Sequence, residues 1–279
     1  MSKKHLIIAS ILGITLIIAS LASCNKSNIG KLKVMTGTSL VTDIVQQVGG
    51  DHVEVFNLVP PSEHPGNFDV KPGDIKTLST ANLFLLQGLP GETYVDNFVS
   101  AANNPTLKVI KSNVDGNWMI PSIQSSAVDW VLSALIDVDP ANAADYQTAA
   151  TNYKQAILNE EQDIESKLVA ANVTKINVIA SSRQTDFLQW AGFNVVGTFD
   201  DASSLTPRAV QNLVDIGKLD HVTLVVNNLQ DSEDAGKGIA AAIGAKNLNL
   251  SNFPGGLKNT NTWEKAIDYN VNLLLSAIK

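Results

Sequence analysis

Residues 139–171 read DPANAADYQTAATNYKQAILNEEQDIESKLVAA, and the prediction of the fold begins from this segment. It contains no glycine, and its single proline, Pro140, follows Asp139 at the position expected for the first helical turn. Asp139 and Pro140 form a favourable N-cap and N1 pair. We therefore predict one helix of roughly 30 residues, about 45 Å long at 1.5 Å per residue. A helix of this length connects the two flanking parts of the chain stiffly.

Short β-rich runs alternate with helical patterns on both sides of this helix. The runs lie at residues 31–37, 52–59, 82–88 and 107–110, and again at 175–180, 193–199, 221–226 and 247–250. Strands that alternate with helices indicate parallel sheets covered on both faces. We predict an α/β fold of two lobes, each a four-stranded parallel sheet with flanking helices, joined by one long backbone helix. The predicted boundaries are 32–138, 139–171 and 172–279.

The amino terminus reads MSKKHLIIASILGITLIIASLASC. Two lysines precede an uncharged apolar run, which is typical of a secretory signal peptide, here residues 1–23. The alternative is a retained transmembrane helix, for which the run is slightly short. The final Leu-Ala-Ser-Cys resembles the bacterial lipobox and predicts that Cys24 carries a lipid. Residues 24–31 then form a tether, and the protein lies on the extracytoplasmic face of the cell membrane.

Composition excludes several classes of protein. Cys24 is the only cysteine, so the exported part has no disulfide and no thiolate metal ligand. A net charge of −7 argues against a nucleic-acid partner. The sequence lacks the nucleophile-elbow, Walker, dinucleotide-binding and His-Glu-x-x-His motifs, so we expect no enzyme. We expect a monomer.

The position of each histidine relative to the strands separates a candidate ligand from surface residues. In open parallel sheets, ligands bind beyond the carboxyl ends of the strands. His64 follows the run at 52–59 and so lies at that end, whereas His52 and His221 precede strands. A cleft between the two lobes, at which both sheets present this edge, is a preferred position for a ligand.

Three segments resemble one known family. They are KVMTGTSLVTDIVQQVGGDHVEVFNLVPP, FDVKPGDIKTLSTANLFLLQG and DPANAADYQTAATNY, in that order. Together they are similar to the substrate-binding lipoproteins of bacterial zinc/manganese ABC importers, from about residue 32 to the end. The resemblance implies that a metal ion, zinc or manganese, is captured between the lobes and delivered to a membrane permease. We also predict small rearrangements on ligand binding, because a continuous helix joins the lobes.

The resemblance implies ligands at four positions, and the chain departs from the family at most of them. The expected loop histidine aligns at or near Asn67, three residues after His64; the second position falls at Asn117, the third at 182–184 and the fourth at 251–252. Zn²⁺ favours sulfur, imidazole and carboxylate ligands, whereas Mn²⁺ accepts oxygen more readily. The predicted metal ligands are His64, Glu63 (or Asp69), Asn67, Asn117, Gln184 and Asn252.

The permanently charged Arg183 leaves other ligands open. Ser182, Arg183, Asn227 and Ser251 are predicted to contact the ligand, and an anion, a chelated metal or a small polar molecule would suit them and the neighbouring amides. A further alternative is a surface adhesin with a degenerate cleft.

Overall fold

The computed structural model describes residues 30–279. The predicted signal peptide, Cys24 and most of the predicted tether therefore lie outside the described residues. Within the described range, no helix combines the length and apolar character needed to cross a membrane.

The first lobe is built on a parallel four-stranded sheet. Its strands are β1 (Leu32–Thr36), β2 (Val53–Asn57), β3 (Leu83–Leu86) and β4 (Lys108–Lys111). They lie in the order β2-β1-β3-β4, with all pairs parallel. The central strand β3 reads LFLL and is buried at all four residues, as expected for a strand of a parallel sheet covered on both faces.

The second lobe repeats this arrangement. Its strands are β5 (Asn177–Ser181), β6 (Asn194–Phe199), β7 (Leu224–Asn228) and β8 (Lys246–Leu250). Their order, β6-β5-β7-β8, corresponds strand by strand to that of the first sheet, and all pairs are again parallel. Both sheets thus bring the loops that follow their strands to one edge.

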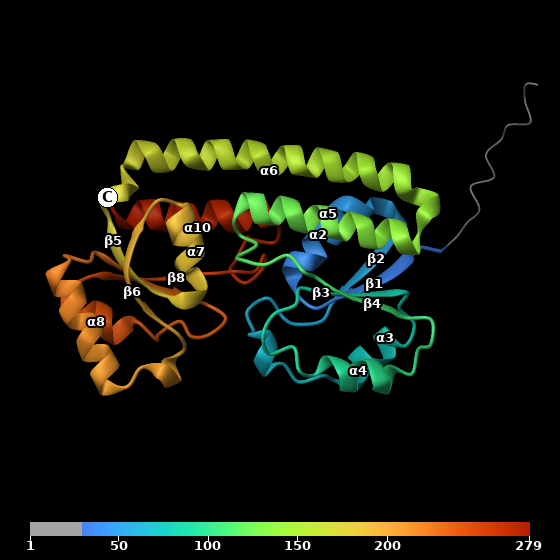
Figure 1. Cartoon of the computed structure of the whole chain (residues 1–279), viewed down its shortest axis with the longest axis horizontal. Helices are drawn as coiled ribbons and strands as arrows, with labels where there is room; N and C mark the ends of the chain where they lie inside the picture. The colour runs from blue at the N-terminus through green and yellow to red at the C-terminus, as the bar shows by residue number, and fades with distance from the viewer. Residues whose placement is uncertain (1–29) are drawn as a thin grey trace, which may run out of the picture. The chain divides into compact units, whose positions relative to one another are not determined.

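Helices cover both faces of each sheet (Figure 1). In the first lobe they are α2 (Ser39–Gly49), α3 (Pro72–Leu78), α4 (Val95–Ala102) and α5 (Pro121–Val138). In the second they are α7 (Thr185–Trp190), α8 (Pro207–Leu219), α9 (Lys237–Ile243) and α10 (Trp263–Ala277). The predicted fold class of two parallel-sheet lobes is confirmed.

The long helix α6 (Ala143–Ala171) runs along α5 and α10 and so contacts both lobes (Figure 1). Its 29 residues span about 44 Å. Asp139 and Pro140 occupy the predicted N-cap and first-turn positions, but of a 3₁₀ turn, η4 (Pro140–Asn142), that leads into the α-helix. The Asp139 carboxylate instead accepts hydrogen bonds from Asn142 Nδ2 at 2.7 Å and from the Tyr146 hydroxyl at 2.6 Å.

Helix α5 was not predicted, although its pattern is present in the sequence. Its buried residues include Gln124, Ala127, Val128, Val131 and Leu135, at the three- and four-residue spacing of one helical face. Pro121 occupies the first turn, where its missing N–H costs nothing. This helix packs between α2 and α6 and completes the layer behind the first sheet.

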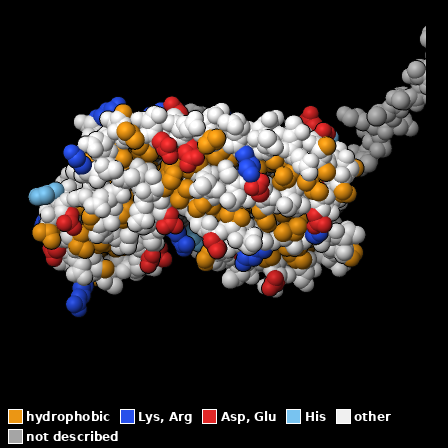
Figure 2. All heavy atoms as spheres, turned by 45° about the horizontal axis from the view of Figure 1, so that its top comes forward, with side chains coloured by type: hydrophobic (Ala, Val, Ile, Leu, Met, Phe, Trp, Pro, Cys, Tyr) orange, Lys and Arg blue, Asp and Glu red, His pale blue; other side chains and the backbone are white. Residues whose placement is uncertain are grey.

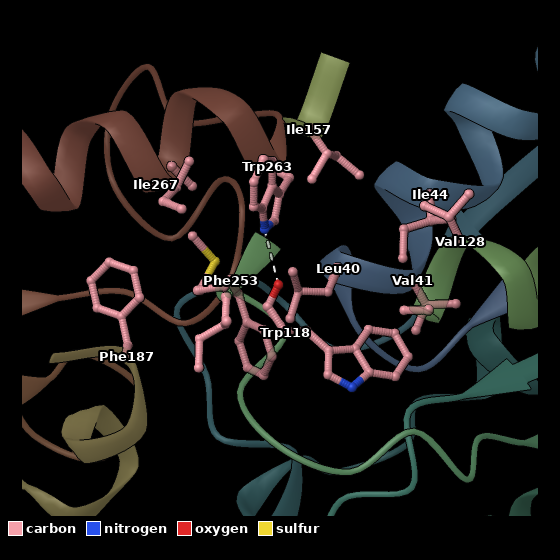
Figure 3. Close-up of a cluster of buried hydrophobic side chains, with 14 of the residues drawn as sticks. Leu40, Val41, Ile44, Trp118, Val128, Ile157, Phe187, Phe253, Trp263 and Ile267 are labelled. Carbon is pink, nitrogen blue, oxygen red and sulfur yellow. Dashed lines mark hydrogen bonds between the residues drawn. The ribbon is translucent and has the colours of Figure 1, made fainter. Parts of the chain in front are cut away.

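One hydrophobic core is shared by the two lobes (Figure 3). It contains Leu40, Ile44 and Trp118 from the first lobe, and Trp263 and Ile267 from the second. The indole Nε1 of Trp263 donates to the Trp118 carbonyl at 2.9 Å, so the contact between the lobes includes a buried hydrogen bond. Smaller clusters fill the outer face of each sheet.

A buried carboxylate lies at the same junction. Asp43 of α2 is 3% exposed, and its Oδ2 accepts hydrogen bonds from the Trp263 backbone N–H and the Tyr153 hydroxyl, both at 3.0 Å. It therefore connects the first lobe, the second lobe and α6. Burial is the main cause that raises the pKa of Asp43 to about 6.

Candidate functional site

The candidate site is a cleft between the lobes, with a cavity volume of about 220 Å³. Its lining comes from loops that follow strands of both sheets, as the rule for parallel sheets predicts. Figure 2 shows a hollow between the lobes with acidic and basic side chains at its rim. The lining residues are Leu40, His64, Pro65, Gln87, Leu89, Pro90, Gly116, Asn117, Trp118, Ser182, Arg183, Asp186, Asn228, Gln230, Asn252 and Phe253.

His64 lies in the wall of the first lobe, as the sequence predicts. It precedes the 3₁₀ turn η3 (Pro65–Asn67), and its Nδ1 accepts a hydrogen bond from the Gly66 N–H at 2.9 Å. A side chain at Gly66 would come within 3.0 Å of this ring, so glycine allows the turn to close on the imidazole. Because Nδ1 is an acceptor, the proton of the neutral ring is on Nε2.

Asp231 faces His64 from the second lobe. Its Oδ1 lies 3.7 Å from His64 Nε2, and its Oδ2 lies 4.0 Å from Arg183 Nε. The Asn228 side chain also donates to Oδ2, at 3.0 Å. The Asp231 side chain is only 11% exposed. Sequence reasoning missed this residue, although it is the first carboxylate after β7 and so follows a strand in the same way as His64.

Amide side chains occupy the floor of the cleft and bond mainly to one another. Asn117 Nδ2 donates to Asn252 Oδ1 at 3.0 Å and to the Arg183 carbonyl at 3.2 Å. Gln184 Nε2 donates to Asn252 Oδ1 at 3.1 Å and to Asn228 Oδ1 at 2.9 Å. Asn117 Oδ1 accepts from the Met119 N–H. The Oδ1 atoms of Asn117 and Asn252, two of the predicted metal ligands, therefore already accept hydrogen bonds.

Gln184 retains one unused acceptor. Its Oε1 is buried and has no hydrogen-bond partner among the described residues, and Gln184 itself is fully buried and lies outside the cavity lining. The structure therefore brings Asn117, Gln184 and Asn252 together, but as a hydrogen-bonded network.

The other predicted site residues separate into two groups. Ser182 and Arg183 line the cleft, and Asn67 lies with His64 in an adjoining polar pocket at its mouth. The Ser182 hydroxyl donates to Asp200 Oδ1 at 2.6 Å. Glu63 and Asp69 are exposed and do not belong to the cavity lining.

Asn227 and Ser251 are buried beneath the cleft and form structural hydrogen bonds. Asn227 Oδ1 accepts from the Gly236 N–H at 2.7 Å, and its Nδ2 donates to the carbonyls of Glu233 and Leu248. The Ser251 hydroxyl donates to the Phe253 carbonyl at 2.9 Å. The proposed contact of either residue with a ligand remains a prediction, and neither lines the cavity.

The free polar groups that face the cavity are mostly donors. They are His64 Nε2–H, the Arg183 guanidinium, which is about half exposed, and the Gln87 amide nitrogen, whose oxygen is held by the Thr38 hydroxyl at 3.0 Å. Asp186 adds a carboxylate at the rim. Across residues 30–279, no group of three or more His, Cys, Asp or Glu side chains is arranged to hold a metal ion.

Solved structures share this fold. A crystal structure of ZnuA superimposes with a TM-score of 0.77 at 19% identity, covering 90% of this chain and all of that one. The Mn-bound periplasmic metal binding protein from Candidatus Liberibacter asiaticus gives a TM-score of 0.75 at 18% identity, covering 89% of this chain and all of that one.

Sequence comparison gives the same relationship. The chain is 23% identical over 247 residues to the iron-binding protein YfeA of Yersinia pestis, covering 82% of this chain and 79% of YfeA. It is 23% identical over 202 residues to the manganese-binding lipoprotein MntA of Halalkalibacterium halodurans, covering 67% of each. The model of the family described as ZnuA, zinc-uptake complex component A, periplasmic, matches residues 34–277. The resemblance inferred from the sequence is thereby confirmed, and the chain belongs to this family of periplasmic components of metal uptake.

Proposed function

We propose that this protein is the extracytoplasmic receptor of an ABC permease and that it captures a metal-containing solute, with zinc or manganese as the ion, in the cleft between its lobes. The observation that carries the proposal is the meeting of His64 and Asp231 across the cleft, 3.7 Å apart and contributed by different lobes. A solute bound beside this pair would contact both lobes at once.

Family membership supports the transport role. Relatives are named as manganese- or iron-binding proteins, and several as substrate-binding lipoproteins of ABC transporters. We extend this role to the present chain, with Cys24 as the lipid anchor at the membrane and no enzymatic activity. The anchor is tested by metabolic labelling with an alkyne fatty acid, which should label the wild-type protein and fail to label Cys24→Ser.

The metal is tested by calorimetric titration of the metal-stripped protein with Zn²⁺ and with Mn²⁺, each alone and each with excess citrate or histidine. Binding in at least one of these forms is expected, and its absence in all of them would refute the proposal. The variant His64→Asn keeps an oxygen that can accept from the Gly66 N–H, so it removes the imidazole with little disturbance of the turn. It should lower affinity at least tenfold, in the range seen when the residues around a metal are altered.

His221→Asn provides the matched control. His221 is exposed, far from the cleft lining, and has φ of 51°, a left-handed conformation that asparagine tolerates. We expect unchanged affinity. Equal losses of affinity in the two variants would show that His64 does not contact the ligand.

A second candidate, a polar or anionic solute without a metal, is favoured by one observation. Arg183 lines the cleft and carries a permanent positive charge. Titration with citrate or histidine in the absence of metal separates this candidate from the first.

A further inference from the structure

The cleft contains too few free metal ligands to hold a bare metal ion. It also contains the positively charged side chain of Arg183, which would repel such an ion. His64 and Asp231 form the one pair of an imidazole and a carboxylate within 4.0 Å between the lobes in residues 30–279. Asp200 and Asp201 line the same pocket, but no group of three or more His, Cys, Asp or Glu side chains in this range is arranged to hold a metal ion. Neutral His64 also has its proton on Nε2, because Nδ1 accepts from Gly66. Ligation through Nε2 would require the proton to move to Nδ1 and that hydrogen bond to break.

Arg183 strengthens the case against a bare ion. Its Nε lies 4.0 Å from Asp231, the carboxylate that would hold the metal. A divalent cation beside Asp231 would be repelled by the guanidinium, since like charges several ångströms apart interact unfavourably even near a protein surface. An anionic group between the metal ion and the Arg183 guanidinium would remove this repulsion.

The free donors of the cleft define what that group presents. Arg183, His64 Nε2–H and the Gln87 amide nitrogen face the cavity, whereas the oxygens of Asn117, Asn228 and Asn252 already accept hydrogen bonds within the protein. A ligand rich in hydrogen-bond acceptors would satisfy these free hydrogen-bond donors. Carboxylate oxygens fit best, because arginine binds a carboxylate with two parallel hydrogen bonds.

The size and the remaining charge of the cavity point to a ligand that contains more than an anion. About 220 Å³ is room for several groups of the size of water, which takes roughly 30 Å³ in the liquid. Asp186 lines this cavity, and Asp231, Asp200 and Asp201 line the adjoining pocket beside Arg183, so negative charge lies close to the guanidinium. A ligand that carries both a positive centre and carboxylates would complement the aspartates and Arg183 at the same time.

We infer that the solute is a complex of a divalent metal with a small carboxylate-bearing organic chelator. The chelator supplies most of the metal's ligands and binds Arg183, Gln87 and His64 through its carboxylates, while Asp231 and Asp186 lie toward the metal. This inference rests on the proposed function and specifies its substrate class.

The test compares Mn²⁺ alone, citrate alone, Mn²⁺ with citrate and Zn²⁺ with histidine, by calorimetry on the metal-stripped protein. We expect at least one complex to bind tenfold or more tightly than both of its components. Arg183→Gln should remove this advantage while leaving any weak binding of free Mn²⁺ unchanged. Arg208→Gln is the matched control, because Arg208 is the only other arginine and is exposed outside the cleft lining.

Each other result overturns the inference in a distinguishable way. If the bare ion binds as tightly as the complex, the chelator is not needed, and the proposed metal receptor survives without it. If the chelator alone binds as tightly as the complex, the receptor takes an anion, and both proposals fail. If no form binds, both fail. If Arg183→Gln and Arg208→Gln behave alike, Arg183 does not hold the chelator.

Discussion

The lobes of this protein meet in two places that differ in chemistry. Behind the cleft, Trp118, Trp263 and their neighbours form one continuous apolar core, with Asp43 as its buried polar contact. At the cleft, polar side chains cross between the lobes. Asn117 donates to Asn252, and Gln230 Nε2 donates to the Pro61 carbonyl at 2.8 Å. The first contact excludes water and determines how the lobes are held, whereas the second remains open to a ligand.

This difference assigns stability and binding to separate residues. Removing a buried large side chain costs several kilocalories per mole, whereas hydrogen bonds near solvent contribute about 1 kcal/mol each. We therefore expect substitutions behind the cleft to change the free energy of unfolding, and substitutions within it to change ligand affinity with little effect on stability.

The largest effect is expected for Trp263→Ala. This side chain is fully buried between the lobes, so its loss leaves a cavity and should lower the free energy of unfolding by about 3–5 kcal/mol. Urea unfolding followed by circular dichroism measures the change. Trp190→Ala is the control, because Trp190 is only partly buried at the edge of the second lobe, where it packs against Phe187. Equal losses in the two variants would contradict a shared core as the main contact between the lobes.

The next largest effect is a pH dependence of the free energy of unfolding, which arises from Asp43. Its pKa is about 6 in the folded protein against 3.8 for an ordinary aspartate, so the folded state binds the proton more readily than the unfolded state between these values. The stabilisation by protonated Asp43 is therefore fully present below about pH 4 and is lost as the pH rises to about 6. The loss amounts to about 3 kcal/mol.

The variant Asp43→Asn isolates this contribution. It keeps an oxygen that can accept from the Trp263 N–H but cannot ionise, so the fall in stability between about pH 3 and 7 should be smaller than in the wild type by about 3 kcal/mol. Unfolding free energies measured across this range test it. Asp51→Asn, at an exposed aspartate, should leave the wild-type profile unchanged. Identical profiles for wild type and Asp43→Asn would show that Asp43 does not titrate in this range.

The smallest effect is expected for the motion of the lobes. The shared core and the continuous helix α6 resist rotation, so ligand binding should change the distance between lobes by only about 1–2 Å, as in small shifts of packed helices. Spin labels on Lys76→Cys and Asp215→Cys, both exposed on helices of different lobes, report this distance in a Cys24→Ser background. Lys76→Cys with Ser100→Cys gives the control within one lobe. A shift of the size of hinge closure would contradict the prediction.

Several features of the site were predictable because they depend on local sequence. The strand before His64 and the broken segment around it place this histidine at the carboxyl edge of the first sheet. The same reasoning did not select Asp231, because nothing local shows that this carboxylate faces His64, 167 residues earlier in the chain. Helix α5 could also have been predicted, because its apolar residues have the three- and four-residue spacing of one helical face.

The two parallel-sheet lobes and the long helix between them follow from short-range periodicity and from the absence of helix breakers, so they can be predicted from the sequence. Which polar atoms of the cleft are free depends on how distant segments pack together. Asn117 and Asn252 are 135 residues apart, and their mutual hydrogen bond satisfies amide groups that, in the sequence, resemble available metal ligands. A side chain's chemical type is fixed by the sequence, but whether its donors and acceptors are already used depends on contacts between distant segments, and the ligand responds only to the groups that remain.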